Sequence, residues 1–477
     1  MQIHDALGDW SARPGPLYLR LTAAIRAAID RGDIAPGSLV PPERSLAKRL
    51  AISRSTVVAA YSQLREEGLV VSRQGSGTWV RGAPRNATTD TPPDALRMSA
   101  LRGATTVIDL ATAALPAHDH VRYLIATLDD KDTAAALGTP GYLPAGLPAL
   151  REAVAARLTD QKLPTSPEQV LVTTGDQQAL SLLCTCTLHP GDTALVEDPT
   201  SPGILDVLHA LPVNTIGTRP VVAGQEDLIH AIDRYHSKLV YLLPTLGPQG
   251  RILDLAARAR LARRLAERPT LVVDDTSQSD LTFDLAPPPL AAFADATNLI
   301  TVGSLTKLHW GGLRMGWIRG HSPLIANLTR AKIRADLGTP VLDQLLAVRL
   351  LRAEEQIRSA RLATLRACLT HAETVLPQHL PEFSWKPPAG GLNLWLRLPA
   401  GTATAFTEIA TRLGVAVVPG ALLSPQQAAD DHIRLVYARP PNVFDEGIRR
   451  LAAAWKHYRR AATATTTSGY PQTPVLT

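Results

Sequence analysis

Residues 298–317 have the sequence NLITVGSLTKLHWGGLRMGW, an apolar run followed by a glycine-rich stretch. The run at 299–302 is short and mostly apolar, which is typical of a strand buried on both faces of a sheet. Two cations, Lys307 and Arg314, follow it seven positions apart among small residues. Ligands of open α/β folds bind beyond the carboxyl ends of the strands, so the two cations indicate a binding site.

Four further apolar runs have the same character: QVLVTTG (169–175), TALVED (193–198), KLVYLLP (238–244) and TLVVDD (270–275). Short continuous strands that alternate with helices favour an α/β fold with a mostly parallel central sheet, covered on both faces. We therefore expect functional side chains at the strand ends, in residues 173–177, 244–250, 274–276 and 303–307.

The bulk composition narrows the class of protein. A chain of 477 residues with 45% hydrophobic and 19% charged residues is globular and long enough for two or three domains. Three cysteines are too few for a disulfide framework or a four-cysteine zinc site, so we expect no metal and a reducing compartment. Neither a signal peptide nor a membrane span is visible, which predicts a soluble, cytoplasmic protein.

The first eighty residues follow a different pattern. Leu21 and Ile25 recur at helical spacing, PPER (41–44) opens a second helix, and a third is expected at about 54–67. The β-prone stretches LVVSR and TWV flank QGSG and predict a hairpin. This order is that of a winged helix-turn-helix. Residues 1–81 hold 11 Lys+Arg and 7 Asp+Glu, a basic excess that by itself is weak support for a polyanionic partner.

Composition also sets the domain boundaries. Residues 82–106 are rich in Ala, Pro, Thr, Asp and Arg without periodicity, which predicts a linker. Residues 461–477 are similarly biased and are predicted to form a disordered tail. The winged helix is thus expected at 12–81 and the α/β domain at 107–460.

The strand ends carry the groups that a phosphorylated pyridine needs. TGD (174–176) begins a helix, where backbone N–H groups bind phosphate. Ser304 and Arg314 can complete a phosphate cup around an aldehyde held by the Lys307 amine. Asp274 ends a strand, where a carboxylate would keep a pyridine nitrogen protonated. Taken singly, Lys307 is also consistent with a surface lysine and Asp274 with a helix cap.

These stretches resemble two known families. GSLTKLHWGGLRMGW, LVTTGDQQAL, PGDTALVEDPTSPG and GYLPAGLPALREAVAARL are similar to motifs of fold-type I, aspartate-aminotransferase-like domains that bind pyridoxal 5'-phosphate (PLP). Residues 16–80 resemble a GntR-type winged helix. The two in tandem, over about residues 12–458, resemble the MocR subfamily of bacterial GntR-type transcription regulators. This resemblance implies a smaller C-terminal α+β part and double-stranded operator DNA as a partner.

The resemblance also implies a role for individual residues. Lys307 would form the aldimine with PLP, and Asp274 would pair with the pyridine nitrogen. The phosphate would be held by Ser304, Arg314, Thr174 and the Gly175 and Asp176 amides. Tyr142 would reach the cofactor phosphate of the other subunit, which implies a head-to-tail homodimer, and Arg434 matches an arginine that binds an amino acid carboxylate.

In the winged helix, the resemblance assigns DNA contacts to two helix starts and the wing. Arg44, Ser53, Arg54, Ser55 and Thr56 match positions that contact backbone and bases, and Gln74 and Gly75 lie at the wing tip. Short hydroxyls at a helix N-terminus suit phosphates, and arginine suits guanine edges. Ser53 is equally suited to cap its helix.

Four positions depart from the aminotransferase pattern. Ser201 stands where an aromatic residue stacks on the ring, Gly247 where asparagine is usual, Thr276 where tyrosine is frequent, and Asp176 where a small uncharged residue is usual. Each change removes a group that orients or tunes PLP. Asp176 either caps its helix or repels the phosphate.

We therefore expect a cytoplasmic, nucleoid-associated dimeric regulator rather than an enzyme, with residual or half-transaminase activity at most. It would sense an amino-acid- or amine-type metabolite, or PLP itself, through the aldimine at Lys307. Two alternatives stay open. One is an active PLP-dependent aminotransferase with an accessory DNA-binding domain, and the other is a cofactor-free dimerisation scaffold.

Overall fold

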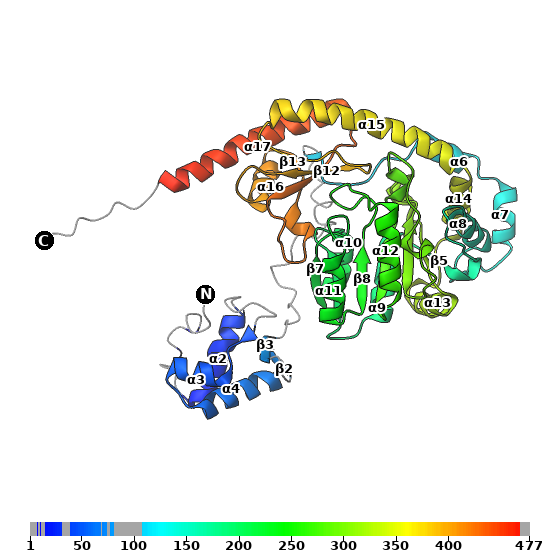
Figure 1. Ribbon diagram of the computed structural model, residues 1–477. Helices are drawn as coiled ribbons and strands as arrows, with labels where there is room; N and C mark the ends of the chain where they lie inside the picture. The colour runs from blue at the N-terminus through cyan, green and yellow to red at the C-terminus, as the bar shows by residue number, and fades with distance from the viewer. Residues whose placement is uncertain are drawn as a thin grey trace. The chain divides into compact units, whose positions relative to one another are not determined.

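The computed structural model describes residues 15–30, 39–67, 69–73, 77–80 and 107–467, together with Leu7 and Trp10. The chain divides into two compact units, Met1–Thr91 and Pro92–Thr477. Figure 1 shows the elements of both units. The linker predicted at 82–106 lies outside the described residues.

The described residues of the first unit form three helices and a small antiparallel sheet. Its elements are α2 (Leu17–Asp30), β1 (Leu39–Val40), α3 (Glu43–Leu50), α4 (Arg54–Glu66), β2 (Val70–Arg73) and β3 (Gly77–Val80). Strands β2 and β3 form the expected hairpin, and β1 adds to the other edge of β3, in the order β1-β3-β2. The winged helix-turn-helix prediction is confirmed. Strand β1 was not predicted.

Apolar side chains from all three helices and the hairpin form the core of this unit. Leu21, Ile25, Leu46 and Leu64 are completely buried. Burying such a side chain stabilises a fold by about 1.5–3 kcal/mol. Tyr61, also buried, donates from its hydroxyl to the carbonyl oxygen of Pro41 at 2.9 Å and so ties α4 to the start of α3.

The second unit is built on a seven-stranded sheet of order β5-β11-β10-β9-β8-β6-β7. The strands are β5 (Val170–Thr173), β6 (Thr193–Glu197), β7 (Asn214–Thr218), β8 (Leu239–Leu242), β9 (Leu271–Asp275), β10 (Leu299–Ser304) and β11 (Gly316–Arg319). Neighbours from β10 to β7 run parallel. Strand β11 lies between β5 and β10 and is antiparallel to both. The mostly parallel sheet is confirmed.

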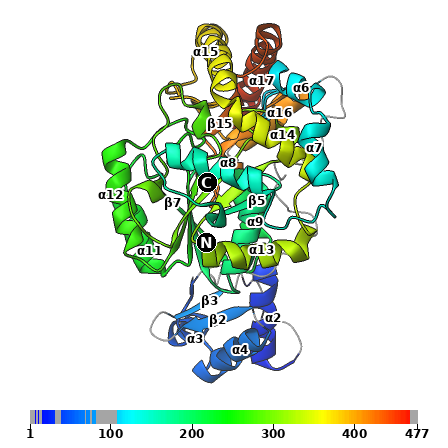
Figure 2. The same cartoon turned by 90° about the vertical axis from the view of Figure 1, so that its right-hand side faces the viewer.

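Helices cover both faces of this sheet (Figures 1 and 2). One face packs against α9 (Asp176–Thr187), α10 (Pro202–His209) and α13 (Ser322–Asp336). The other packs against α8 (Pro148–Asp160), α11 (Glu226–Tyr235), α12 (Leu255–Ala266) and α14 (Val341–Arg352). Within β9, Val272 packs on the α12 side and Val273 on the α9 side, because successive strand residues point to opposite faces.

A smaller C-terminal part follows the long helix α15 (Glu354–His379). It contains the antiparallel sheet β12-β15-β14, formed by β12 (Asn393–Arg397), β15 (His432–Val436) and β14 (Val418–Pro419), together with α16 (Ala403–Arg412). Strand β13 (Val415–Ala416) pairs in parallel with β4 (Ile108–Asp109) from the start of the unit. Helix α17 (Pro441–Thr467) packs along α15 (Figure 1).

The remaining helices, α6 (Asp119–Ala126) and α7 (Asp130–Leu137), precede α8. At the other end of the unit, α17 continues past residue 461, where the sequence predicted that a disordered tail would begin. Residues 468–477 lie outside the described residues. No helix in the described ranges is long and apolar enough to cross a membrane.

Candidate functional site

Lys307 lies in the turn after β10, half-buried at the end of the sheet. Burial lowers the pKa of Lys307. The charges of Arg434 and Arg314 lower it further, and those of Asp176 and Asp275 oppose the shift. The structure therefore surrounds one amine with two guanidinium groups and two carboxylates. A lowered pKa increases the share of neutral, nucleophilic amine at neutral pH.

The start of α9 and the start of β11 form a turn suited to an anion. Gly175 has a φ of 82°, and a Cβ there would lie 2.8 Å from Nη2 of Arg314. That Nη2 donates to the carbonyl oxygen of Thr174 at 2.9 Å. Arg314 is thus held against a helix N-terminus, the place where N–H groups and the helix dipole favour negative charge. The structure brings these three predicted residues together.

The Thr174 N–H and the Ser304 hydroxyl, from two residues predicted to bind phosphate, form hydrogen bonds within the protein. The Thr174 N–H donates to Oε1 of Gln178 at 2.8 Å. The Ser304 hydroxyl lies 2.6 Å from the Thr306 hydroxyl and donates to the carbonyl oxygen of Met315 at 3.2 Å. The Ser304 hydroxyl is therefore hydrogen-bonded to residues of its own loop, at the predicted phosphate site.

Asp274 is not brought to Lys307. Like Val272, it points to the α12 side of the sheet, where its Oδ2 accepts a hydrogen bond from the Leu290 N–H at 2.6 Å. Burial raises the pKa of Asp274, and the charge of Arg258 opposes the rise. The aspartate on the Lys307 side of β9 is therefore not Asp274, as expected from the sequence, but the next residue, because adjacent residues of a strand face opposite ways.

Asp275 takes that place on the Lys307 side. Its carboxylate accepts hydrogen bonds from the Tyr241 hydroxyl and, at 2.8 Å, from the Ser277 N–H. Burial, followed by the charge of Asp176, raises the pKa of Asp275 to about 6. Sequence reasoning missed both Asp275 and Tyr241. The sequence did contain a hint, because TLVVDD ends in two consecutive aspartates. These two residues point to opposite faces of the strand, and the sequence alone does not say which of them faces the site.

Asp176 is the first residue of α9 and is half-buried. Its carboxylate makes no hydrogen bond or ion pair with any residue that the structure describes, so it does not cap its helix. Its charge acts on Lys307, Asp275 and Tyr241. The Asp176 carboxylate therefore belongs to the same cluster.

Ser201, Thr276 and Gly247 lie in the turns around these groups. Ser201 is the residue before α10. Thr276 donates from its hydroxyl to the carbonyl oxygen of Val302 at 2.8 Å. Neither side chain offers an aromatic face. Gly247 lies in the turn after β8, where its carbonyl oxygen accepts from the Gly250 N–H at 2.8 Å.

The segment after β4 crosses the site and supplies backbone acceptors. The Lys307 Nζ donates to the carbonyl oxygen of Ala113 at 2.8 Å, and Nη2 of Arg434 donates to that of Ala111 at 2.9 Å. Burial lowers the pKa of Arg434 to about 10, opposed by the charge of Asp109. The buried Nε of Arg434 has no hydrogen-bond partner in the described part of the chain. This guanidinium keeps donor capacity for an anion.

Tyr142 lies outside the cluster. Its side chain is 70% exposed, close in sequence to the likewise exposed Leu137. It makes no hydrogen bond to a described residue of its own chain. A role across a subunit boundary stays a prediction.

The predicted DNA-contacting residues lie at the starts of α3 and α4. Arg44, Ser53, Arg54 and Ser55 are exposed. Ser53 caps α4: its Oγ accepts from the Thr56 N–H at 3.1 Å and lies 2.7 Å from the Thr56 hydroxyl. Gln74 and Gly75, predicted at the wing tip, lie outside the described residues.

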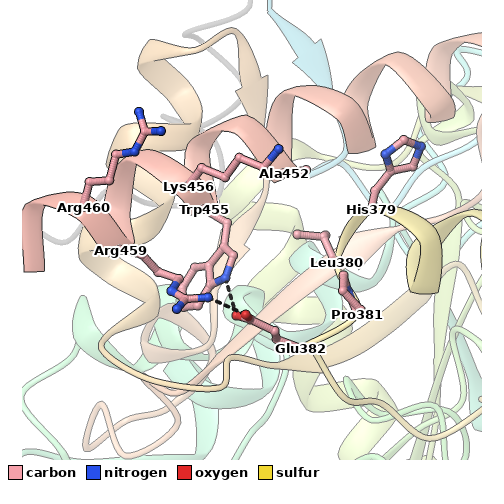
Figure 3. A pocket seen from close by; sticks show the side chains of 9 residues that line it. All are labelled: His379, Leu380, Pro381, Glu382, Ala452, Trp455, Lys456, Arg459 and Arg460. Atoms are coloured by element: carbon pink, nitrogen blue, oxygen red, sulfur yellow. Dashed lines mark hydrogen bonds and ion pairs between the residues drawn. The ribbon is translucent and has the colours of Figure 1, made fainter. Parts of the chain in front are cut away.

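Away from this cluster, a surface pocket of about 390 Å³ lies between the end of α15 and α17 (Figure 3). Its lining comprises His379, Leu380, Pro381, Glu382, Ala452, Trp455, Lys456, Arg459 and Arg460. Glu382 accepts from Nε1 of Trp455 at 2.9 Å and from Arg459. None of these residues belongs to the Lys307 cluster. No group of three or more metal-ligating side chains was found among the residues described.

Comparisons with known proteins agree with this two-part arrangement. Residues 17–80 match the family model of bacterial regulatory proteins of the gntR family, and residues 105–451 match that of aminotransferase class I and II. YisV, an uncharacterized HTH-type transcriptional regulator of Bacillus subtilis, is 27% identical over 456 residues, covering 89% of this chain and 92% of that protein. The HTH-type pyridoxine biosynthesis transcriptional regulator PdxR of Corynebacterium glutamicum is 26% identical, covering 84% and 87% respectively.

The larger unit also resembles solved structures. The crystal structure of LysN, the alpha-aminoadipate aminotransferase of Thermus thermophilus, complexed with N-(5'-phosphopyridoxyl)-L-leucine, matches with a TM-score of 0.68. The two chains are 27% identical, and the match covers 78% of this chain and 98% of LysN.

A GntR-type winged helix joined to an aminotransferase class I and II domain defines a class of transcription regulators. The chain belongs to the aminotransferase class I and II family and, through this combination, to the MocR subfamily of GntR-type regulators. Its winged helix-turn-helix implies DNA binding.

Proposed function

We propose that this regulator binds PLP at Lys307 and changes its binding to operator DNA when an amino-acid- or amine-type metabolite, or PLP itself, reaches that site. The observation that carries the proposal is the Lys307 cluster. It places an amine of lowered pKa, an anion-binding turn and a buried carboxylate at one end of the sheet. The winged helix in the same chain supplies the output.

The residues present fit PLP at its phosphate and at its pyridine nitrogen. The turn at Gly175 has no room for a Cβ beside Arg314, so the backbone and the guanidinium are free to close on a phosphate. Asp275 is the carboxylate that faces the cluster, and we assign it, in place of Asp274, to the pyridine nitrogen. Bound PLP would supply an electron sink for negative charge at the carbon that bears the captured amine.

The remaining site residues would then bind and orient. The Lys307 amine, whose pKa is lowered by burial, is the group available to the aldehyde. Arg434 has an unpartnered buried Nε and would take the carboxylate of an effector. The exposed Tyr142 would meet the site of a second subunit in a head-to-tail homodimer.

Two observations each favour one of the alternative functions. The set of charges around Lys307 favours an active aminotransferase with an accessory DNA-binding domain. Ser201 and Asp176, which replace a stacking ring with a hydroxyl and add a negative charge, favour a cofactor-free scaffold. Multiple turnovers with amino and keto acids would support the enzyme, and a protein that takes up no PLP would support the scaffold.

The test is visible spectroscopy of the full-length chain titrated with PLP. Wild type should develop a visible absorption band that Lys307→Ala abolishes. The matched control is Lys386→Ala, which removes an exposed lysine outside the cluster and should leave the band unchanged. A protein-bound band that survives Lys307→Ala, or a wild type that shows only the spectrum of free PLP at saturating PLP, contradicts the proposal. Operator binding is then compared with and without PLP.

A further inference from the structure

Asp176 places a negative charge in the turn where the phosphate of PLP would bind. It is the residue directly after Gly175, at the first position of a twelve-residue helix. The favourable field of a helix N-terminus acts within its first turn, which is where this carboxylate lies. An anion arriving at the turn therefore meets both the helix end and Asp176.

Two other charged groups of the cluster, Asp275 and Arg314, already have hydrogen-bond partners. Asp275 accepts hydrogen bonds from Tyr241 and Ser277, and Arg314 donates to the Thr174 carbonyl. The Asp176 carboxylate, by contrast, has no hydrogen bond or ion pair with a described residue, and its charge acts on Asp275 and Lys307. Because it is half-buried, water screens that charge less than it would at an exposed site.

We infer that Asp176 determines how this site discriminates between ligands with and without a phosphate, so that PLP is held weakly and exchanges freely. The inference rests on the proposed function. The carboxylate repels a phosphate dianion strongly and an uncharged hydroxymethyl group little, because the repulsion scales with the product of the charges. PLP would then act at this site as an exchangeable signal rather than as a permanently bound cofactor.

The test compares PLP with pyridoxal, which has the same ring and aldehyde but no phosphate. Dissociation constants for both are measured by absorbance titration of the full chain. The variants are Asp176→Asn, which keeps the shape, and Asp176→Ser. Asp227→Asn is the matched control, because it removes one carboxylate from the first turn of another helix, α11, whose residues do not belong to the cluster. Thermal unfolding checks that each variant is folded.

Removing the charge should strengthen PLP binding by about tenfold or more and change pyridoxal binding by less than about threefold, since only the phosphate term differs. The control should bind both ligands as wild type does. Equal affinities for PLP in wild type and both Asp176 variants would overturn the inference, as would an equal gain for PLP and pyridoxal.

The outcomes separate this inference from the proposed function. If only the Asp176 variants take up PLP, the inference stands and the dependence of the natural protein on PLP fails. If wild type binds PLP and both variants bind it no better, the regulator proposal stands and the inference fails. If no form takes up PLP, both fail.

Discussion

Lys332→Met should destabilise the second unit, because Lys332 is a buried cation with defined partners. Its side chain is 1% exposed, and its Nζ lies 2.6 Å from Oδ2 of Asp336 and 3.1 Å from Oε1 of Gln178. The same Oε1 accepts the Thr174 N–H, so this polar group underlies the anion-binding turn. Methionine keeps the apolar stem and removes the charge.

The expected loss of stability depends on how well the Asp336 carboxylate is solvated once Lys332 is removed. Breaking a buried ion pair by removing one partner costs about 3–5 kcal/mol. Asp336 is 27% exposed and keeps hydrogen bonds from Gln178 and from the Gly338 N–H, so water and these donors solvate part of its charge. We therefore expect about 2–3 kcal/mol for Lys332→Met. Asp336→Asn should lower the free energy of unfolding by more, because it leaves Lys332, the more deeply buried partner, without its counter-ion.

The assay is urea unfolding of the two single variants and the double variant, followed by tryptophan fluorescence. In the double variant, neither charge is left unpaired, so its loss in free energy of unfolding should be smaller than the sum of the two single losses. Additive losses would refute the reasoning, and so would a Lys332→Met variant as stable as wild type. PLP affinity of the folded variants then shows whether this group supports the turn.

Three further predictions concern other residues. Arg54→Ala should weaken operator binding by about 1–3 kcal/mol in fluorescence anisotropy if Arg54 contacts a base, while Arg65→Ala, on the same helix, should leave it nearly unchanged. Ser53→Ala should cost the first unit about 1 kcal/mol in thermal unfolding through loss of the cap. The pKa of Asp275 is raised from 3.8 to about 6 in the folded protein, so this group contributes fully to the free energy of unfolding below pH 3.8, and the contribution is lost as the pH rises through about 6. In Asp275→Asn, the free energy of unfolding should decline less over this pH range. A variant with the same pH dependence of unfolding as wild type would contradict this prediction.

Much of the fold was predictable because its signals are local. Helical spacing at Leu21 and Ile25 and the strand runs of the second unit gave elements that the structure confirms. The two-residue strand β1 is too short to leave a periodic signal and exists because β3 offers it an edge. The end of α17 was also set too early, since its alanine- and threonine-rich sequence permits helix as well as coil.

The site was predictable in its cations and less so in its carboxylates. Lys307 and Arg314 stand at fixed offsets from a strand end, so sequence alone locates them. The choice between Asp274 and Asp275 depends on which face of β9 meets the site, and that is decided by packing against α9 and α12 rather than by the sequence of β9. The carbonyl acceptors of Ala111 and Ala113 come from a segment far away in the chain.

The antiparallel strand β11 has a mechanical consequence. Because the chain leaves β10 at Ser304 and returns to pair beside it at Gly316, the amine of Lys307 and the guanidinium of Arg314 belong to one short excursion clamped at both ends by the same strand pair. The pairing of β10 with β11 therefore holds the two ends of this segment next to each other. Arg434 stands on another sheet, reached through α15. A ligand that contacts both Lys307 and Arg434 would therefore bridge the two sheets.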